Sequence, residues 1–174
     1  MKIRVLIILS LLVGIGTILH AAIPGLSIAG VKPDLLLSMM FIGIFLFPKA
    51  KYVLLLSLVS GIISALTTSA PGGQIANIID KPITAFVIMA LFLLVQKKVN
   101  TAISAPILTF IGTIISGSIF AFVLSFIASL GEGGFIALFV TAILPAAALN
   151  TVIMVVIYPI IQGIIKRTNL VTIS

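Results

Sequence analysis

Polar side chains that can bind a small charged molecule gather in one short stretch of the sequence. Between Thr67 and Lys81 the chain carries Gln74, Asn77, Asp80 and Lys81 itself. Their spacing of three or four residues places all four on one face if the stretch is helical. Amide, carboxylate and ammonium groups together suit the amino and carboxylate groups of a ligand. The alternative interpretation is an ordinary solvated loop.

A second candidate is the segment Lys32-Pro33-Asp34, where Asp34 either binds a ligand or begins a helix, whose dipole favours a negative charge. Asn150 lies inside a long apolar run, and a lone amide there should face protein, so it either bonds a neighbouring helix or contacts a ligand. His20 is expected to form a structural hydrogen bond, with a ligand contact as the alternative. The candidate substrate-binding residues are Lys32, Asp34, Gln74, Asn77, Asp80, Lys81 and Asn150.

The available residues do not support enzyme chemistry. The chain has no Cys and one His, so it lacks a thiolate nucleophile, a cysteine metal site and a histidine-rich metal site. Asp34 and Asp80 could form an aspartyl protease pair, but the adjacent Lys32 and Lys81 favour ionised carboxylates over a shared proton. There is no phosphate-binding loop. We therefore predict a protein that is not an enzyme and needs no cofactor or metal.

Composition places these residues in a membrane. Of the 174 residues, 61% are hydrophobic and only 7% are charged, and the mean hydropathy is +1.45. So few charges cannot cover a globule in water, which typically carries about 25% charged residues. In a membrane protein the position of each charge matters more than the net charge, so the value of +7 does not indicate a nucleic-acid partner.

Charged residues divide the chain into six apolar blocks. Runs of this kind are typical of transmembrane helices, because a helix satisfies its own backbone in lipid. We expect an all-α integral membrane protein with one six-helix domain covering residues 1–174. The blocks are 5–31, 35–48, 52–79, 82–96, 99–131 and 133–165.

The positions of the basic residues predict the orientation. Six helices with both termini in the cytoplasm place eight of the ten basic residues inside, as the positive-inside rule requires. The inner set is Lys2, Arg4, Lys49, Lys51, Lys97, Lys98, Lys166 and Arg167. The outer set is Lys32 and Lys81, with the acids Asp34, Asp80 and Glu132.

Two apolar blocks are short, at 35–47 and 82–96. At 1.5 Å per residue they cover roughly 20–23 Å, less than the roughly 30 Å of hydrocarbon. Lysines fix their inner ends, so their outer ends, near Asp34 and Asp80, should lie below the outer surface. A polar pocket is expected there, with Phe41, Phe45, Phe86 or Phe135 as possible aromatic walls. Small residues at fourth positions, such as Gly112/Ser116 and Thr113/Gly117, are expected to form helix-packing seams.

Several segments together resemble the bacterial tryptophan transporter family of low-GC Gram-positive bacteria, and the resemblance is strongest over residues 14–92. They are His20-Ala21-Ala22-Ile23-Pro24-Gly25, Lys32-Pro33-Asp34, Pro71-Gly72-Gly73-Gln74 and Asn77-Ile78-Ile79-Asp80-Lys81.

That family is similar to the substrate-binding S components of energy-coupling factor (ECF) transporters. The resemblance implies a six-helix, S-component-like bundle in the bacterial cytoplasmic membrane that takes up tryptophan. It also implies partners, a transmembrane coupling subunit and two ATP-binding-cassette ATPases, with Ser10, Gly14 and Thr17 facing the coupling subunit. The Ala-rich contact motif of many S components has no clear copy here.

Two alternatives remain open. The first keeps the architecture but changes the ligand to another amino acid or a vitamin. The second is a non-transporting six-helix membrane scaffold, which needs no polar pocket.

Overall fold

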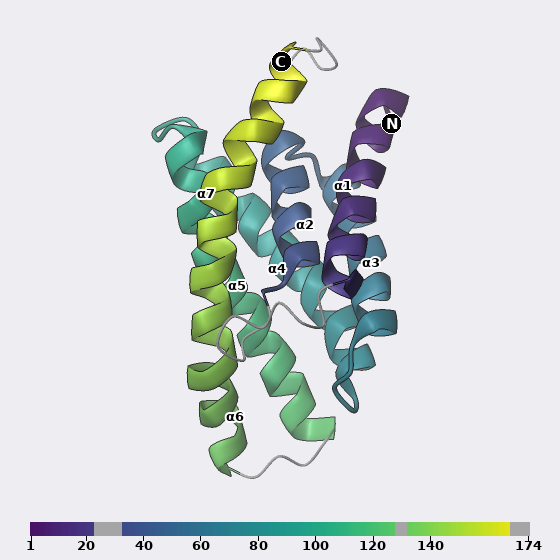
Figure 1. Cartoon of the computed structure of the whole chain (residues 1–174), viewed down its shortest axis with the longest axis vertical. Helices are drawn as coiled ribbons and strands as arrows, with labels where there is room; N and C mark the ends of the chain where they lie inside the picture. Colours follow the sequence, from purple (N-terminus) through teal and green to yellow (C-terminus); the bar gives the residue numbers. More distant parts are fainter. Residues whose placement is uncertain (23–32, 128–131, 168–174) are drawn as a thin grey trace.

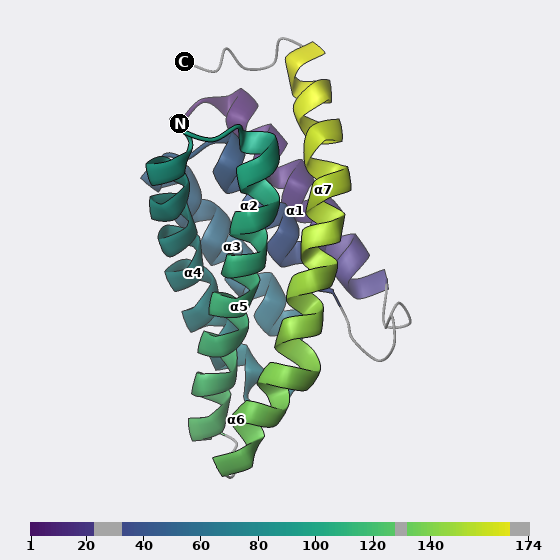
Figure 2. The same cartoon turned by 90° about the vertical axis from the view of Figure 1, so that its left-hand side faces the viewer.

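The computed structural model describes residues 1–22, 33–127 and 132–167, and all regular secondary structure in these ranges is helical. The long helices lie side by side in a bundle, with the start of α1 and the end of α7 at the same end of the molecule (Figures 1 and 2). The elements are α1 (Ile3–Ala22), α2 (Leu35–Leu46), α3 (Ala50–Thr67), α4 (Gly73–Val95), α5 (Thr101–Ile127), α6 (Glu132–Leu138), the π-helical turn η1 (Phe139–Ile143) and α7 (Leu144–Arg167).

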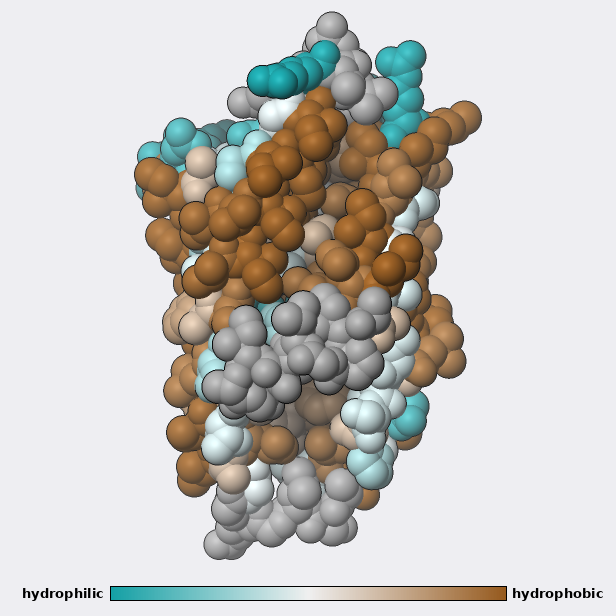
Figure 3. Space-filling model, in the orientation of Figure 1, coloured by the Kyte–Doolittle hydropathy of each residue, from teal (hydrophilic) through white to brown (hydrophobic). Residues whose placement is uncertain are grey.

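The surface of the bundle is apolar, as lipid contact requires. Brown, hydrophobic side chains cover most of the face shown in Figure 3, and the most hydrophilic ones gather at its upper end. Within the described ranges, five helical stretches are long and apolar enough to cross a membrane, with α2 as a shorter apolar helix. The all-helical membrane architecture predicted from the sequence is confirmed. Six spans and the orientation of the termini stay predictions.

Helix α2 occupies the centre of the bundle. Every residue from Leu35 to Phe45 is buried, and the helix packs against α1, α3, α4, α5 and α7. With 12 residues it is about 18 Å long. A helix that is surrounded by protein does not have to match the thickness of the hydrocarbon. Helix α2 is short, as predicted, and space therefore remains inside the bundle beyond its first residue.

The prediction of a second short helix is wrong. Helix α4 begins at Gly73 and has 23 residues, and it continues through Asp80, Lys81 and Pro82 without interruption. The two charges had suggested the end of an apolar block, but they are paired inside the bundle, so the helix does not have to stop there. Its start is fixed by Gly72, whose φ of 80° suits glycine.

Helix α5 lies close to its neighbours along the predicted stripe of small residues. A Cβ added at Gly112 would lie 2.6 Å from the Phe41 ring, and one at Gly117 would lie 2.8 Å from Ile143. Glycine is therefore needed at both positions, because any larger side chain would push α5 away from α2 or from η1.

The last membrane helix contains a wide turn. In η1 the backbone N–H of Leu144 donates to the carbonyl of Phe139, five residues earlier. Pro145 follows directly and has no N–H to donate. Turns of this type are often found at functional sites, where they redirect side chains. Here the turn brings Ala142 and Ile143 to the wall of an internal cavity.

The orientation can be tested because the chain has no Cys. Single Cys residues introduced at the exposed positions Ser69 and Asn100, at opposite ends of the bundle, should differ in their reaction with membrane-impermeant maleimide on intact cells. We expect S69C to react from outside and N100C to react only after permeabilisation. The reverse pattern would contradict cytoplasmic termini.

Candidate functional site

A cavity of about 250 Å³ lies inside the bundle beyond the first residue of α2. Its wall comes from α1, α2, α3, α4, α5, η1 and α7, each time from the part of the helix far from the two chain ends. The polar wall consists of His20, Asp34, Ser64, Thr68, Asn77, Asp80, Lys81, Thr113 and Ser116. The apolar wall consists of Pro33, Leu37, Gly117, Phe120, Ala142, Ile143 and Ala146.

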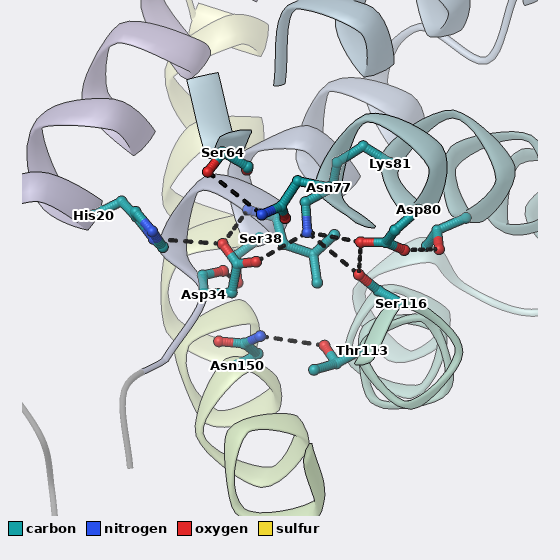
Figure 4. A network of polar contacts seen from close by, with 12 residues as sticks. His20, Asp34, Ser38, Ser64, Asn77, Asp80, Lys81, Thr113, Ser116 and Asn150 are labelled. Atoms are coloured by element: carbon teal, nitrogen blue, oxygen red, sulfur yellow. Dashed lines mark hydrogen bonds and ion pairs between the residues drawn. The ribbon is translucent and has the colours of Figure 1, made fainter. Parts of the chain in front are cut away.

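Lys81 is the centre of the polar wall (Figure 4). Its ammonium donates to Asp34 Oδ2 at 3.1 Å, to Asp80 Oδ2 at 3.0 Å and to Ser116 Oγ at 3.3 Å. An ammonium has three hydrogens, so these partners use all of them. With a side chain only 3% exposed, Lys81 depends on these partners, because an unpaired charge in this place would be strongly destabilising.

Asp80 is closed to any ligand in this arrangement. Its side chain is fully buried, and Oδ2 accepts from both Lys81 and Ser116, the latter at 2.7 Å. Thr84 donates to the other oxygen, also at 2.7 Å. These contacts join α4 to α5, so the role that the geometry supports for Asp80 is to hold Lys81 in place.

Asp34 is the accessible acid. It is the N-cap of α2, where Oδ1 accepts from the N–H of Leu37 at 2.9 Å, and its side chain remains 26% exposed. His20 Nδ1 lies 3.6 Å from the same oxygen. The ammonium of Lys81 and the N–H of Leu37 both stabilise the ionised form of this carboxylate.

The charges of the site do not cancel. Asp34 and Asp80 bring two negative charges and Lys81 brings one positive charge, so the three carry a net charge of −1 when His20 is neutral. Because this charge sits behind an open carboxylate in a low-dielectric bundle, the cavity attracts a cationic group.

The other candidates from the sequence lie in different places. Asn77 lines the cavity, and its amide donates to the carbonyl of Gly73 at 2.9 Å. Asn150 is fully buried and donates to Thr113 Oγ1 at 3.2 Å. Gln74 lies on the exposed side of α4 and does not line the cavity. Lys32 lies outside the described residues.

The contribution of α5 to the cavity wall was not predicted from the sequence. Thr113, Ser116, Gly117 and Phe120 all face the cavity. The signal was present in the stripe of small residues, which was interpreted only as a packing seam. Two of its members carry hydroxyl groups, and in an apolar helix these need polar partners.

None of the four phenylalanines predicted as possible aromatic walls lines the cavity. Phe41 and Phe45 are buried in the core, where Phe45 packs against Phe92 with ring centroids 5.0 Å apart. Neither Phe86 nor Phe135 lines the cavity, whose aromatic wall is Phe120.

The residues proposed to face a partner lie on the outside of α1. Ser10 and Gly14 are exposed, Thr17 is half-buried, and all three line an apolar groove between α1 and α3. A Cβ added at Gly14 would meet nothing within 4 Å.

The fold defines a polytopic helical membrane protein with an internal cavity lined by charged and polar side chains. Among the described residues there is no cluster of His, Cys, Asp or Glu that would hold a metal ion. The family described as "Tryptophan transporter TrpP" matches residues 2–166. The chain therefore belongs to this family, and the resemblance seen over residues 14–92 is confirmed and extended.

Three relatives agree with this assignment. A probable tryptophan transport protein of Bacillus subtilis is 50% identical, with 97% of this chain and 96% of the relative covered. Proteins with the same description from Clostridium acetobutylicum and Clostridium perfringens are 36% and 34% identical, with 91% and 96% of both chains covered. These names indicate a transporter rather than an enzyme. No solved structure matches the chain significantly.

The network around Asp80 gives a stability prediction. Asp80→Ala removes one of the two counterions of Lys81 and leaves the hydroxyls of Ser116 and Thr84 without their acceptor. We expect a loss of about 3 kcal/mol in unfolding free energy, measured as a lower midpoint of thermal unfolding in detergent. The control Lys97→Gln, at an exposed position, should leave the midpoint unchanged. Equal midpoints for both variants would contradict a structural role for Asp80.

Proposed function

We propose that this protein mediates tryptophan uptake across the bacterial plasma membrane and binds its substrate in the cavity around Asp34 and Lys81. The observation that carries the proposal is the ion pair between Lys81 Nζ and Asp34 Oδ2, 3.1 Å apart, on the wall of the cavity. Membership of the family supports tryptophan as the substrate.

An amino acid suits this ion pair because it carries both charges. Its ammonium can pair with Asp34 and its carboxylate with Lys81, so the ligand enters between the two side chains and each charge keeps a partner. An anion that replaced Asp34 at Lys81 would leave the Asp34 carboxylate without its ammonium partner in a poorly solvated place. The ion pair therefore favours a zwitterion over a simple anion.

The apolar wall suits an aromatic side chain. Leu37, Phe120 and Ile143 lie on the cavity wall beside the charges. The volume of about 250 Å³ is near the lower end of ligand pockets, which begin at about 300 Å³. One amino acid is a better fit than a larger nutrient such as a vitamin with a nucleotide-like tail.

The proposal includes a role as the substrate-binding S component of an ECF-type transporter. The sequence has no nucleotide-binding motif, so ATP-driven uptake would need separate ATPases. The groove beside Ser10, Gly14 and Thr17 is the surface that we assign to a transmembrane coupling subunit. With cytoplasmic termini, the cavity lies in the outer half of the bundle, where substrate arrives.

Direct binding tests the substrate. The chain has no Trp, so the fluorescence of bound tryptophan can be followed in detergent without background. Asp34→Asn should weaken binding by at least tenfold, because it removes the charge that pairs with the ammonium; tenfold corresponds to about 1.4 kcal/mol. Gln74→Ala, on the exposed side of α4, is the matched control and should bind normally. Unchanged affinity in a folded Asp34→Asn protein would refute this site.

Reconstitution tests the source of energy. Purified protein in liposomes should bind tryptophan but should not accumulate it under an imposed proton or sodium gradient. Accumulation should require added coupling and ATPase subunits. Strong uptake by the protein alone would exclude the S-component role and identify a self-sufficient carrier.

A further inference from the structure

Asn150 carries a polar atom that the fold does not use. The residue is fully buried in α7, and its Oδ1 has no hydrogen-bond donor among the described residues. A buried amide oxygen without a donor is costly, and more so in a membrane bundle. Asn150 lies one turn beyond Ala146, a residue of the cavity wall. Its hydrogen-bond partner Thr113 also lines the cavity.

The orientation of this amide follows from Thr113. The hydroxyl of Thr113 gives its single hydrogen to the carbonyl of Thr109 at 2.8 Å. Its oxygen can therefore only accept, so the group of Asn150 that faces it must be the NH₂. The amide oxygen is then directed away from Thr113, as Figure 4 shows. A flipped amide would place two acceptors against each other.

We infer that Asn150 Oδ1 is the acceptor for the indole N–H of the substrate, and so the residue that selects an aromatic ring with a donor. This inference rests on the proposed function, since it names a further contact of tryptophan in the same cavity. The amino-acid end is held by charges at Asp34 and Lys81. The ring then has to satisfy its one polar group deeper in the bundle, where Asn150, just beyond the cavity-lining residues Ala146 and Thr113, supplies an acceptor that needs a donor.

Asn150 is distinguished from the other polar groups near the ligand. Asp80 already accepts from three donors. The hydroxyl oxygen Oγ of Ser64 also lacks a partner, but a hydroxyl can rotate and donate as well as accept, so it cannot discriminate between ring donors and acceptors. The amide oxygen of Asn150 is fixed by Thr113 and can only accept. A fixed acceptor is the arrangement that rejects a ligand lacking the donor.

The test compares tryptophan with 3-benzothienyl-L-alanine, which has sulfur in place of the indole N–H and nearly the same shape. Titration calorimetry in detergent measures both ligands on the wild type and on Asn150→Leu, which keeps the volume but removes the acceptor. We expect the wild type to bind tryptophan at least tenfold more tightly than the analogue. Asn150→Leu should bind both within about twofold, mainly through weaker tryptophan binding.

Two comparisons decide the result: the ligand preference of a matched control variant and the ligand preference of the wild type by itself. Thr151→Val, which also removes a polar group from α7, should keep the wild-type preference. Equal affinities on the wild type would overturn the inference whether or not Asn150→Leu folds, and so would a preference that persists in folded Asn150→Leu. If tryptophan fails to bind the wild type at all, the proposed function itself fails.

Discussion

A cation buried in a membrane bundle must keep its partners, and the interior of this protein is arranged around that requirement. Lys81 lies near the middle of the bundle with a side chain that is 3% exposed. It needs acids from two different helices and a hydroxyl from a third. These contacts connect α2, α4 and α5 at one level. Any change in the spacing of the three helices would break at least one of them.

The short central helix makes this arrangement possible. Because α2 is only 12 residues long and enclosed by other helices, its first turn begins inside the bundle rather than at the surface. Its N-cap carboxylate therefore meets Lys81 in the interior. The N-terminal dipole of α2 and the ammonium of Lys81 both stabilise the negative charge of Asp34. The cavity forms in the space that a longer helix would have filled.

The two acids around Lys81 differ in what they can do. Asp80 has used its acceptors on protein groups and is closed, whereas Asp34 is partly exposed, with His20 Nδ1 3.6 Å from its Oδ1. A residue with spare capacity can exchange a protein partner for a ligand, but a saturated residue can do so only by disrupting the fold. In the proposed function, a zwitterion therefore enters by exchanging ion pairs with Asp34 and Lys81, so that no charge is left unpaired.

The sequence determined the membrane class, the helical blocks and the identity of most polar groups. Its charge-free runs are long, and lipid forces such runs into helices. It also indicated that Asn77, Asp80 and Lys81 share a face, because a spacing of three or four residues depends only on helix geometry. The family resemblance was readable as well, since it rests on contiguous segments.

Only the tertiary structure decided which groups meet. It carried α4 through Asp80 and Lys81, because pairing with Asp34 and Ser116 removed the reason for the helix to end there. It left Gln74 exposed in the first turn of α4, and it brought Phe120 of α5 to the cavity wall, which depends on how α5 is rotated against its neighbours. Local sequence fixes the face of one helix, but contacts between helices 35 residues or more apart depend on packing of the whole bundle.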